Sequence, residues 1–325
     1  MSGTVAEGLT LGRASAEPPV RAVFFGSGGF AVPILDALVA MPGVAVEAVV
    51  SAPDRPVGRK AILTATPVTV RADELGLPVL RPERVRRSES VAQLRALAPD
   101  LVVLADYGQL IPRALLELPT RGFLNLHPSA LPRHRGAAPI PATILAGDTE
   151  SAVTLVVVTE EMDAGPIVAT EPLAVLPGDT AVTLEERAAE TAARLLRRAL
   201  PDWLAGHLEA RTQPEVGVTL TRPLRREDGR LDPRRPADEL ERQVRAYQPW
   251  PGAYFETPEG RLIVWRAHVA PSVPGEVAGG LVASGRDELA LAANGDRLVL
   301  DEVQLAGGRR MATAELLRGH PSLAR

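Results

Sequence analysis

The feature that most constrains the fold of this 325-residue chain is an alternation of short apolar runs with helix-like segments after residue 20. The runs RAVFFGS, VAVEAVVS and DLVVLADYG have the length and apolar character of buried strands. The segments AVPILDALVAM and SVAQLRALAP, which lie between them, place apolar residues at helical spacing. Strands that alternate with helices usually form a parallel sheet covered on both faces. We therefore predict an α/β domain with a doubly wound parallel sheet over residues 20–206.

The sequence changes character after residue 206. Residues 207–224 are charged, contain proline and are weakly periodic, as is typical of a linker. Residues 225–325 contain one amphipathic segment, PADELERQVRAY, and the short strand-like runs RLIVWRAHV, GEVAG, ELALAA and DRLVLDEVQL. Short, closely spaced strands predict a smaller, mostly-β C-terminal domain, an OB-like barrel or a sandwich. Residues 1–19 are small, polar and aperiodic, so we predict a disordered extension there.

The composition excludes several classes of chemistry. The chain has no cysteine, which excludes disulfides, a thiol nucleophile, iron–sulfur clusters and Cys-ligated zinc. No apolar run approaches the roughly 18 residues of a membrane-spanning helix, and the first residues lack the pattern of a secretory leader. The formal charge of −4 permits a nucleic-acid partner without requiring one. We expect a cytoplasmic monomer that uses no metal ion.

A glycine-rich turn follows the first predicted strand. In FFGSGGFA, residues Gly26, Gly28 and Ala31 form a G-x-G-x-x-A pattern, which is typical of a turn that binds a dinucleotide pyrophosphate. Asp54 lies near the position of a ribose-binding acid, although it falls in the loop-like stretch APDRPVGRK. Glycine also serves the tight first turn of a doubly wound sheet that has no ligand. An NAD-dependent oxidoreductase is therefore one alternative for the function.

Polar side chains end the predicted strand GFLNLH. Asn125 and His127 point to the same face because alternate residues of a strand share a face, and Pro128 ends the ladder. The carboxyl ends of parallel strands are where open α/β sheets bind ligands. An amide that donates to an oxyanion, beside an imidazole that titrates near neutral pH, suits acyl transfer to an amine. Asp163, in the turn after the next strand, is placed to orient His127. In isolation, the same residues are also typical of a turn cap and a core histidine.

These residues belong to longer motifs. The stretch NLHPSALPRHRGAAPI, with MDAGP downstream, resembles the 10-formyltetrahydrofolate-dependent formyltransferases. The runs GSGGFAVPIL, PDRPVGRK, DYGQLIP, QPWPGAYF and DEVQLAGGRRM extend the resemblance along the chain after residue 20. The resemblance implies a Rossmann-like fold, 10-formyltetrahydrofolate as formyl donor, and Asn125, His127 and Asp163 as the catalytic residues.

The resemblance also implies the acceptor and the binding residues. The acceptor would be the α-amine of methionyl-initiator tRNA, and the product would serve translation initiation. The folate pocket would include four consecutive residues: Ser129, Ala130, Leu131 and Pro132. The methionyl group and the tRNA would contact an aromatic residue and three cations of the first domain: Phe30, Arg55, Arg59 and Lys60.

Some positions depart from the pattern of the family, namely Gly28-Gly29, Asp106, Ala130 and Pro141. Asp106 and Ala130 bear on folate affinity more than on the type of reaction. A formyltransferase for a small amine, such as a nucleotide sugar or glycinamide ribonucleotide, would share the catalytic residues and is a second alternative. The second domain and the basic loop favour tRNA over a small amine. A non-catalytic RNA-binding protein on the same fold is a third alternative.

Overall fold

The computed structural model describes residues 18–57, 61–273, 279–284 and 287–324. Residues 1–17 of the predicted extension lie outside the described residues, as do most of GEVAG and two of the predicted tRNA contacts, Arg59 and Lys60. Within the described part of the chain, no helix is both long and apolar enough to cross a membrane.

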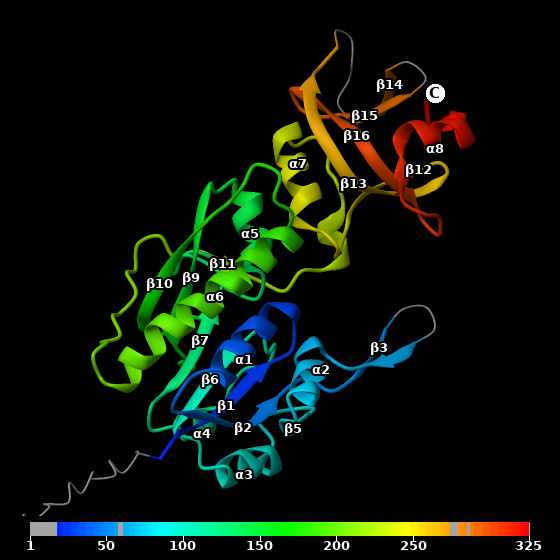
Figure 1. Ribbon diagram of the computed structural model, residues 1–325. Helices are drawn as coiled ribbons and strands as arrows, with labels where there is room; N and C mark the ends of the chain where they lie inside the picture. Colours follow the sequence, from blue (N-terminus) through cyan, green and yellow to red (C-terminus); the bar gives the residue numbers. More distant parts are fainter. Residues whose placement is uncertain (1–17, 58–60, 274–278, 285–286, 325) are drawn as a thin grey trace, which may run out of the picture.

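The first domain is built on a seven-stranded sheet with the order β10-β9-β7-β6-β1-β2-β5 (Figure 1). The five parallel strands are β1 (Val20–Gly26), β2 (Val44–Val50), β5 (Val79–Leu80), β6 (Leu101–Ala105) and β7 (Phe123–His127). At one end of the sheet, β9 (Glu150–Val157) and the edge strand β10 (Ile167–Ala174) are antiparallel to their neighbours. The predicted α/β fold class, with a doubly wound sheet built on parallel strands, is confirmed, and the two antiparallel strands extend this sheet at one end. Residues 158–166, which join β9 to β10, are too short for the crossover that parallel neighbours need, so these two strands pair in the antiparallel direction.

Helices cover both faces of this sheet, as a doubly wound fold requires. The helices are α1 (Val32–Val39), α2 (Pro67–Glu74), α3 (Ser88–Ala96), α4 (Arg113–Leu116), α5 (Pro139–Ala146) and α6 (Ala181–Leu204), with a short 3-10 turn, η1 (Gly29–Ala31), before α1. One core joins residues of α1, α2, α5 and α6, such as Leu35 and Leu184. The core on the other face includes Leu94 of α3 and Leu115 of α4.

The second domain is a mostly antiparallel sheet with the order β12-β13-β16-β15-β14, with β17 beside β16. Its strands are β12 (Ala253–Thr257), β13 (Gly260–Pro271), β14 (Leu281–Ser284), β15 (Glu288–Ala292), β16 (Asp296–Leu305) and β17 (Met311–Ala312). Two helices flank this sheet, α7 (Ala237–Ala246) and α8 (Thr313–Gly319). Leu240 and Val244 of α7 are buried against Leu262 and Leu300 of the sheet. The predicted mostly-β second domain is thereby confirmed.

Two short strand pairs lie outside the main sheets. A hairpin of β3 (Arg55–Val57) and β4 (Ile62–Thr64) projects from the first domain beside α2 (Figure 1). In the second pair, β11 (Leu220–Thr221) lies parallel to β8 (Arg135–Gly136). Because β11 belongs to residues 207–224, that segment packs along the first domain before it reaches the second. The domain boundaries themselves stay predictions.

Candidate active site

Strand β7 places two polar side chains in the interior of the first domain. Asn125 is 8% exposed and His127 is 4% exposed. Leu124 and Leu126 belong to the core on one face of the sheet, whereas Phe123 belongs to the core on the other. This alternation puts Asn125 and His127 on the Phe123 side, as the sequence predicts.

Asp163 reaches this pair from the connection between β9 and β10. Its Oδ1 accepts a hydrogen bond from Nδ2 of Asn125 at 3.2 Å, and its Oδ2 accepts one from the backbone N–H of Gly136 at 2.9 Å. Oδ2 also lies 3.6 Å from Nδ1 of His127, which is an ion-pair distance but too long for a hydrogen bond. The structure therefore brings the three predicted catalytic residues together. Their catalytic roles stay predictions.

The hydrogen bond that orients His127 comes from a different residue. Nε2 of His127 lies 3.0 Å from the backbone carbonyl oxygen of His134. A carbonyl oxygen only accepts, so Nε2 carries the hydrogen and donates it. In the neutral ring, Nδ1 then holds the lone pair and faces Asp163. This contact could not be predicted, because a backbone carbonyl has no signature in the sequence.

The backbone around Asp163 is supported by residues from the predicted linker. Gln213 is 6% exposed, and its Nε2 donates to the carbonyl oxygens of Asp163 and Gly165, both at 2.8 Å. Its Oε1 accepts hydrogen bonds from Nε and Nη2 of Arg135, at 3.0 and 2.7 Å. Asp163 has a left-handed backbone with φ of 51°, which is uncommon outside glycine, so this support offsets local strain. The role of Gln213 could not be predicted, because its segment of the sequence shows no periodicity.

Gly136 allows β8 to approach β11 closely. A Cβ atom at this position would lie 2.2 Å from the carbonyl oxygen of Thr221, and the φ of Gly136 is 111°. Only glycine fits such a contact without displacing the backbone. The N–H that Gly136 donates to Asp163 is therefore fixed by the packing of the linker segment.

The predicted folate segment forms a compact turn directly after β7. Ser129 is fully buried, and its hydroxyl donates to the carbonyl oxygen of Arg133 at 2.7 Å. The carbonyl oxygen of Ser129 accepts a hydrogen bond from Oγ1 of Thr154 at 2.7 Å, and the Leu131–Pro132 peptide is cis. The side chain of Ser129 thus stabilises the turn by a hydrogen bond within it. Folate binding by residues 129–132 stays a prediction.

Of the four predicted acceptor residues, the structure describes Phe30 and Arg55. Phe30 is 3% exposed and belongs to the core that α1 and α6 share. Arg55 is exposed on the β3–β4 hairpin, and Arg59 and Lys60 lie outside the described residues. Contacts of these residues with a methionyl group or tRNA stay predictions.

The glycine-rich turn faces a carboxylate of its own chain. Asp106 follows β6 and accepts a hydrogen bond from the backbone N–H of Gly28, and a Cβ atom on Gly28 would lie 1.8 Å from its Oδ2. Asp106 is exposed as a whole residue, yet the protein that surrounds its carboxyl group raises its pKa by desolvation. Desolvation, followed by repulsion from Asp106, also raises the pKa of Glu185 on α6. Two carboxylates beside this turn oppose the binding of a pyrophosphate.

Comparison with known proteins identifies the family. The family model described as "Formyl transferase" matches residues 20–200, and "Formyl transferase, C-terminal domain" matches residues 223–321. The chain belongs to the formyltransferase family. The resemblance inferred from the motifs is confirmed, and the chain is an enzyme that transfers a formyl group. Two of the alternative functions are therefore excluded, namely an NAD-dependent oxidoreductase and a non-catalytic RNA-binding protein.

Curated relatives of this formyltransferase match it along nearly its whole length. A methionyl-tRNA formyltransferase of Myxococcus xanthus is 43% identical over 92% of this chain and 95% of its own. A methionyl-tRNA formyltransferase of Halorhodospira halophila is 42% identical over 92% of this chain and 96% of its own. Among solved structures, an N-formyltransferase of Helicobacter canadensis in complex with folinic acid and dTDP-3-aminofucose has a TM-score of 0.63. It is 15% identical over 86% of this chain and 98% of its own, so it shows a shared fold alone.

Proposed function

We propose that this formyltransferase transfers the formyl group of 10-formyltetrahydrofolate to the α-amine of methionyl-initiator tRNA. The product, formylmethionyl-tRNA, serves translation initiation. The observation that carries this function is the 43% identity to a methionyl-tRNA formyltransferase over 92% of the chain, which includes both domains. The sugar-modifying relatives of known structure are far more distant in sequence, at 15% identity in the case of the Helicobacter canadensis protein.

Asn125 is the donor that best suits the developing oxyanion. When the amine attacks the formyl carbon, a C–N bond forms and negative charge develops on the formyl oxygen. The amide of Asn125 carries two hydrogens, and one of them is donated to Asp163. The second hydrogen is the one that can stabilise the oxyanion, and the bond to Asp163 fixes its direction in advance.

His127 is the proton acceptor that the site offers. Because Nε2 donates to the carbonyl oxygen of His134, Nδ1 is the nitrogen that can accept the proton released by the attacking amine. Asp163, 3.6 Å from Nδ1, would stabilise the imidazolium ion that forms. The proton then passes to the nitrogen of the departing tetrahydrofolate as the bond from that nitrogen to the formyl carbon breaks.

The binding of the two substrates follows the motifs of the family. A folate is the source of the formyl group, and the turn of residues 129–132, next to Asn125 and His127 along the chain, would hold it. The hairpin loop PDRPVGRK, with Arg55, Arg59 and Lys60, would bind phosphates near the acceptor end of the tRNA. We place the protein in the cytoplasm, where its tRNA substrate is used.

The first test is transfer of labelled formyl from 10-formyltetrahydrofolate to methionyl-initiator tRNA. Uncharged initiator tRNA and a nucleotide amino sugar are the two comparison acceptors. Label on the charged tRNA alone supports the proposal. Label on the amino sugar instead would replace the acceptor and leave formyl transfer in place.

A further inference from the structure

A second histidine–aspartate pair, His134 and Asp148, lies beside His127, whose Nε2 donates to the backbone carbonyl of His134. His134 is 6% exposed, and its Nε2 lies 3.0 Å from Oδ2 of Asp148. Both oxygens of Asp148 also accept a hydrogen bond from Nη2 of Arg133, at 2.8 Å. Nε2 of His134 is therefore the donor, because the carboxylate can only accept.

The backbone of His134 is held on its other side by the linker segment. Its N–H donates to Oγ1 of Thr219 at 2.7 Å, and the same hydroxyl lies 3.4 Å from Nδ1 of the ring. His134 has a left-handed backbone with φ of 59°, which an ordinary side chain rarely adopts. This conformation points the carbonyl oxygen at Nε2 of His127, 3.0 Å away. The side-chain contacts of His134 thus maintain a strained backbone whose carbonyl oxygen accepts the hydrogen bond from His127.

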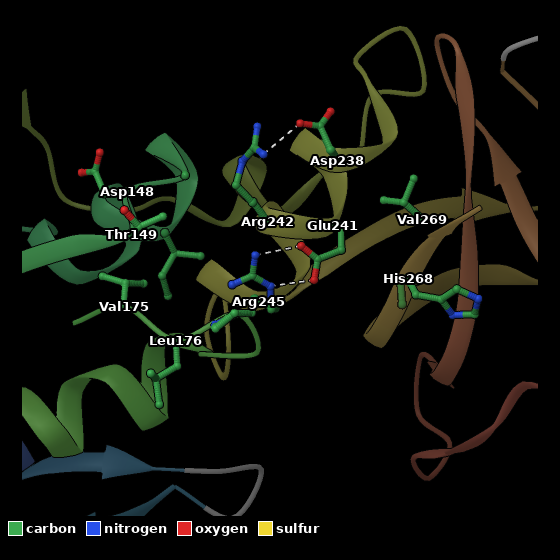
Figure 2. A pocket seen from close by; sticks show the side chains of 14 residues that line it. Asp148, Thr149, Val175, Leu176, Asp238, Glu241, Arg242, Arg245, His268 and Val269 are labelled. Atoms are coloured by element: carbon green, nitrogen blue, oxygen red, sulfur yellow. Dashed lines mark hydrogen bonds and ion pairs between the residues drawn. The ribbon is translucent and has the colours of Figure 1, made fainter. Parts of the chain in front are cut away.

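Asp148 connects this arrangement to the boundary between the domains. It lies at the end of α5 and lines a cavity of about 460 Å³. Figure 2 shows Asp148 and Thr149 on one side of this cavity and His268 and Val269 of the second domain on the other. Arg242 of α7 packs on Gly147, the residue before Asp148. The charged side chains of the cavity wall already have partners: Arg242 pairs with Asp238, Arg245 with Glu241, and Asp148 with His134, so the cavity alone identifies no ligand.

We propose that His134 and Asp148 are positioning residues for formyl transfer. They hold the carbonyl of residue 134 against Nε2 of His127, and so determine which ring nitrogen of His127 accepts the proton of the amine. Without that acceptor, the His127 ring would place its hydrogen on Nδ1, toward Asp163, and lose its basic nitrogen at the reacting position. The charged and titratable groups around the His134 ring are Asp148, Arg133 and His127, and Asp163 lies beyond His127.

The decisive variant is His134→Phe, which keeps an aromatic ring and removes both ring nitrogens. We expect kcat for formyl transfer to fall by about 10- to 100-fold, as for a misplaced catalytic group, with KM for both substrates unchanged. The pH profile of kcat should shift, and the ¹⁵N spectrum of His127 should show loss of the Nε2–H tautomer. His134→Gln, whose amide can still donate to Asp148, should recover most of the activity. Unchanged kcat and an unchanged His127 tautomer in folded His134→Phe would overturn the proposal.

Three further variants keep the test decisive. If His134→Phe does not fold, Asp148→Asn takes its place, and the same change or absence of change in the His127 tautomer decides the question. The matched control is His268→Phe, which breaks an exposed histidine–aspartate pair with Asp301 in the second domain and should change nothing. The proposal rests on the proposed function, and His127→Ala separates the two. Full activity in His127→Ala would remove the assumed role of His127, whereas an inactive His127→Ala beside a fully active His134→Phe would remove only the positioning role.

Discussion

Two histidine–aspartate pairs, His127 with Asp163 and His134 with Asp148, lie beside the end of β7. They differ in the groups that donate hydrogen bonds to each carboxylate. Asp148 accepts hydrogen bonds from His134 and from the cation Arg133, so its charge is balanced within the protein. Asp163 accepts hydrogen bonds only from neutral donors among the described residues, the amide of Asn125 and the N–H of Gly136. His127 lies within ion-pair distance of Asp163, at 3.6 Å, but makes no direct hydrogen bond to it.

This difference separates a reacting pair from a supporting pair by electrostatics. A carboxylate already paired with Arg gives little net stabilisation to a neighbouring imidazole that becomes charged, because the Arg cation repels the new positive charge. A carboxylate held by neutral groups keeps its full charge for an imidazolium that forms during the reaction. The same two residue types therefore have different roles: His127 and Asp163 act on the reacting groups, and His134 and Asp148 position His127.

The largest expected effect is on the reacting pair itself. His127→Ala should lower kcat by about 10²- to 10⁴-fold, the usual contribution of a general acid–base group. Single-turnover formyl transfer measures this loss without interference from product release. A loss no larger than that of His134→Phe would remove the distinction between the two pairs.

Asn125→Ala should have the next largest effect. Loss of one oxyanion donor typically costs about 2.7–4 kcal/mol of transition-state stabilisation, or a 10²- to 10³-fold fall in kcat. Steady-state assays with both substrates would show a changed kcat and an unchanged KM. Asn294→Ala, at an exposed asparagine in the second domain, is the matched control. Near-normal turnover in Asn125→Ala would place the oxyanion elsewhere.

Gly136→Ala tests the support of Asp163. The added methyl group would lie 2.2 Å from a backbone oxygen at a left-handed φ, so we expect a loss of about 1–3 kcal/mol in the free energy of unfolding. Urea denaturation measures this loss. Gly178→Ala is the control, since a Cβ atom there meets nothing within 4 Å. Equal midpoints for both variants would show that β8 and β11 can separate freely.

Asp148→Asn tests the charge balance of the supporting pair through pH. Burial opposes ionisation of Asp148, but hydrogen bonds from His134 and Arg133 outweigh it and lower the pKa below 3.8. The charged form therefore stabilises the fold above pH 3.8, and this stability is lost as the pH falls through the lower pKa of the folded state. We expect Asp148→Asn to cost about 1.5–3 kcal/mol at neutral pH, the range for hydrogen bonds to charged groups. Urea midpoints measured from pH 7 to pH 3 should converge with those of the parent only at the acid end.

Asp106→Asn should give the smallest effect, with the opposite sign. Desolvation raises the pKa of Asp106 above 3.8, so its charged form destabilises the fold at neutral pH. The variant should be slightly more stable than the parent at pH 7, and this advantage should shrink as the pH falls through the raised pKa. Thermal unfolding across the same pH range checks the trend. A variant that is less stable than the parent at pH 7 would contradict it.

Much of the arrangement of the site could be predicted because it depends on local periodicity. In FLNLH the alternation of side chains alone puts Asn125 and His127 on one face, and the structure agrees. The strand–helix alternation likewise predicts a sheet covered on both sides. The direction of β9 and β10 could not be predicted, because periodicity says nothing about which way a strand runs.

The supporting contacts could not be predicted, for a physical reason. Gln213 contacts Asp163 across 50 positions of the chain, and Thr219 contacts His134 across 85. Such contacts depend on how an aperiodic segment runs over the domain, and many of the partners are backbone groups common to every residue. The carbonyl of His134 is the clearest case, since any residue that adopts its backbone conformation would present the same oxygen.

The packing of residues 207–224 bears on where this enzyme can be cut. A fragment that ends at residue 206 would keep Asn125, His127 and Asp163, but it would lack Gln213, Thr219 and Thr221. The hydrogen bond from Gln213 to the carbonyl of Asp163 and the hydrogen bond from the N–H of His134 to Thr219 would both be lost. The smallest working unit is therefore longer than the sheet and its helices, and an isolated catalytic module should be designed to end no earlier than β11.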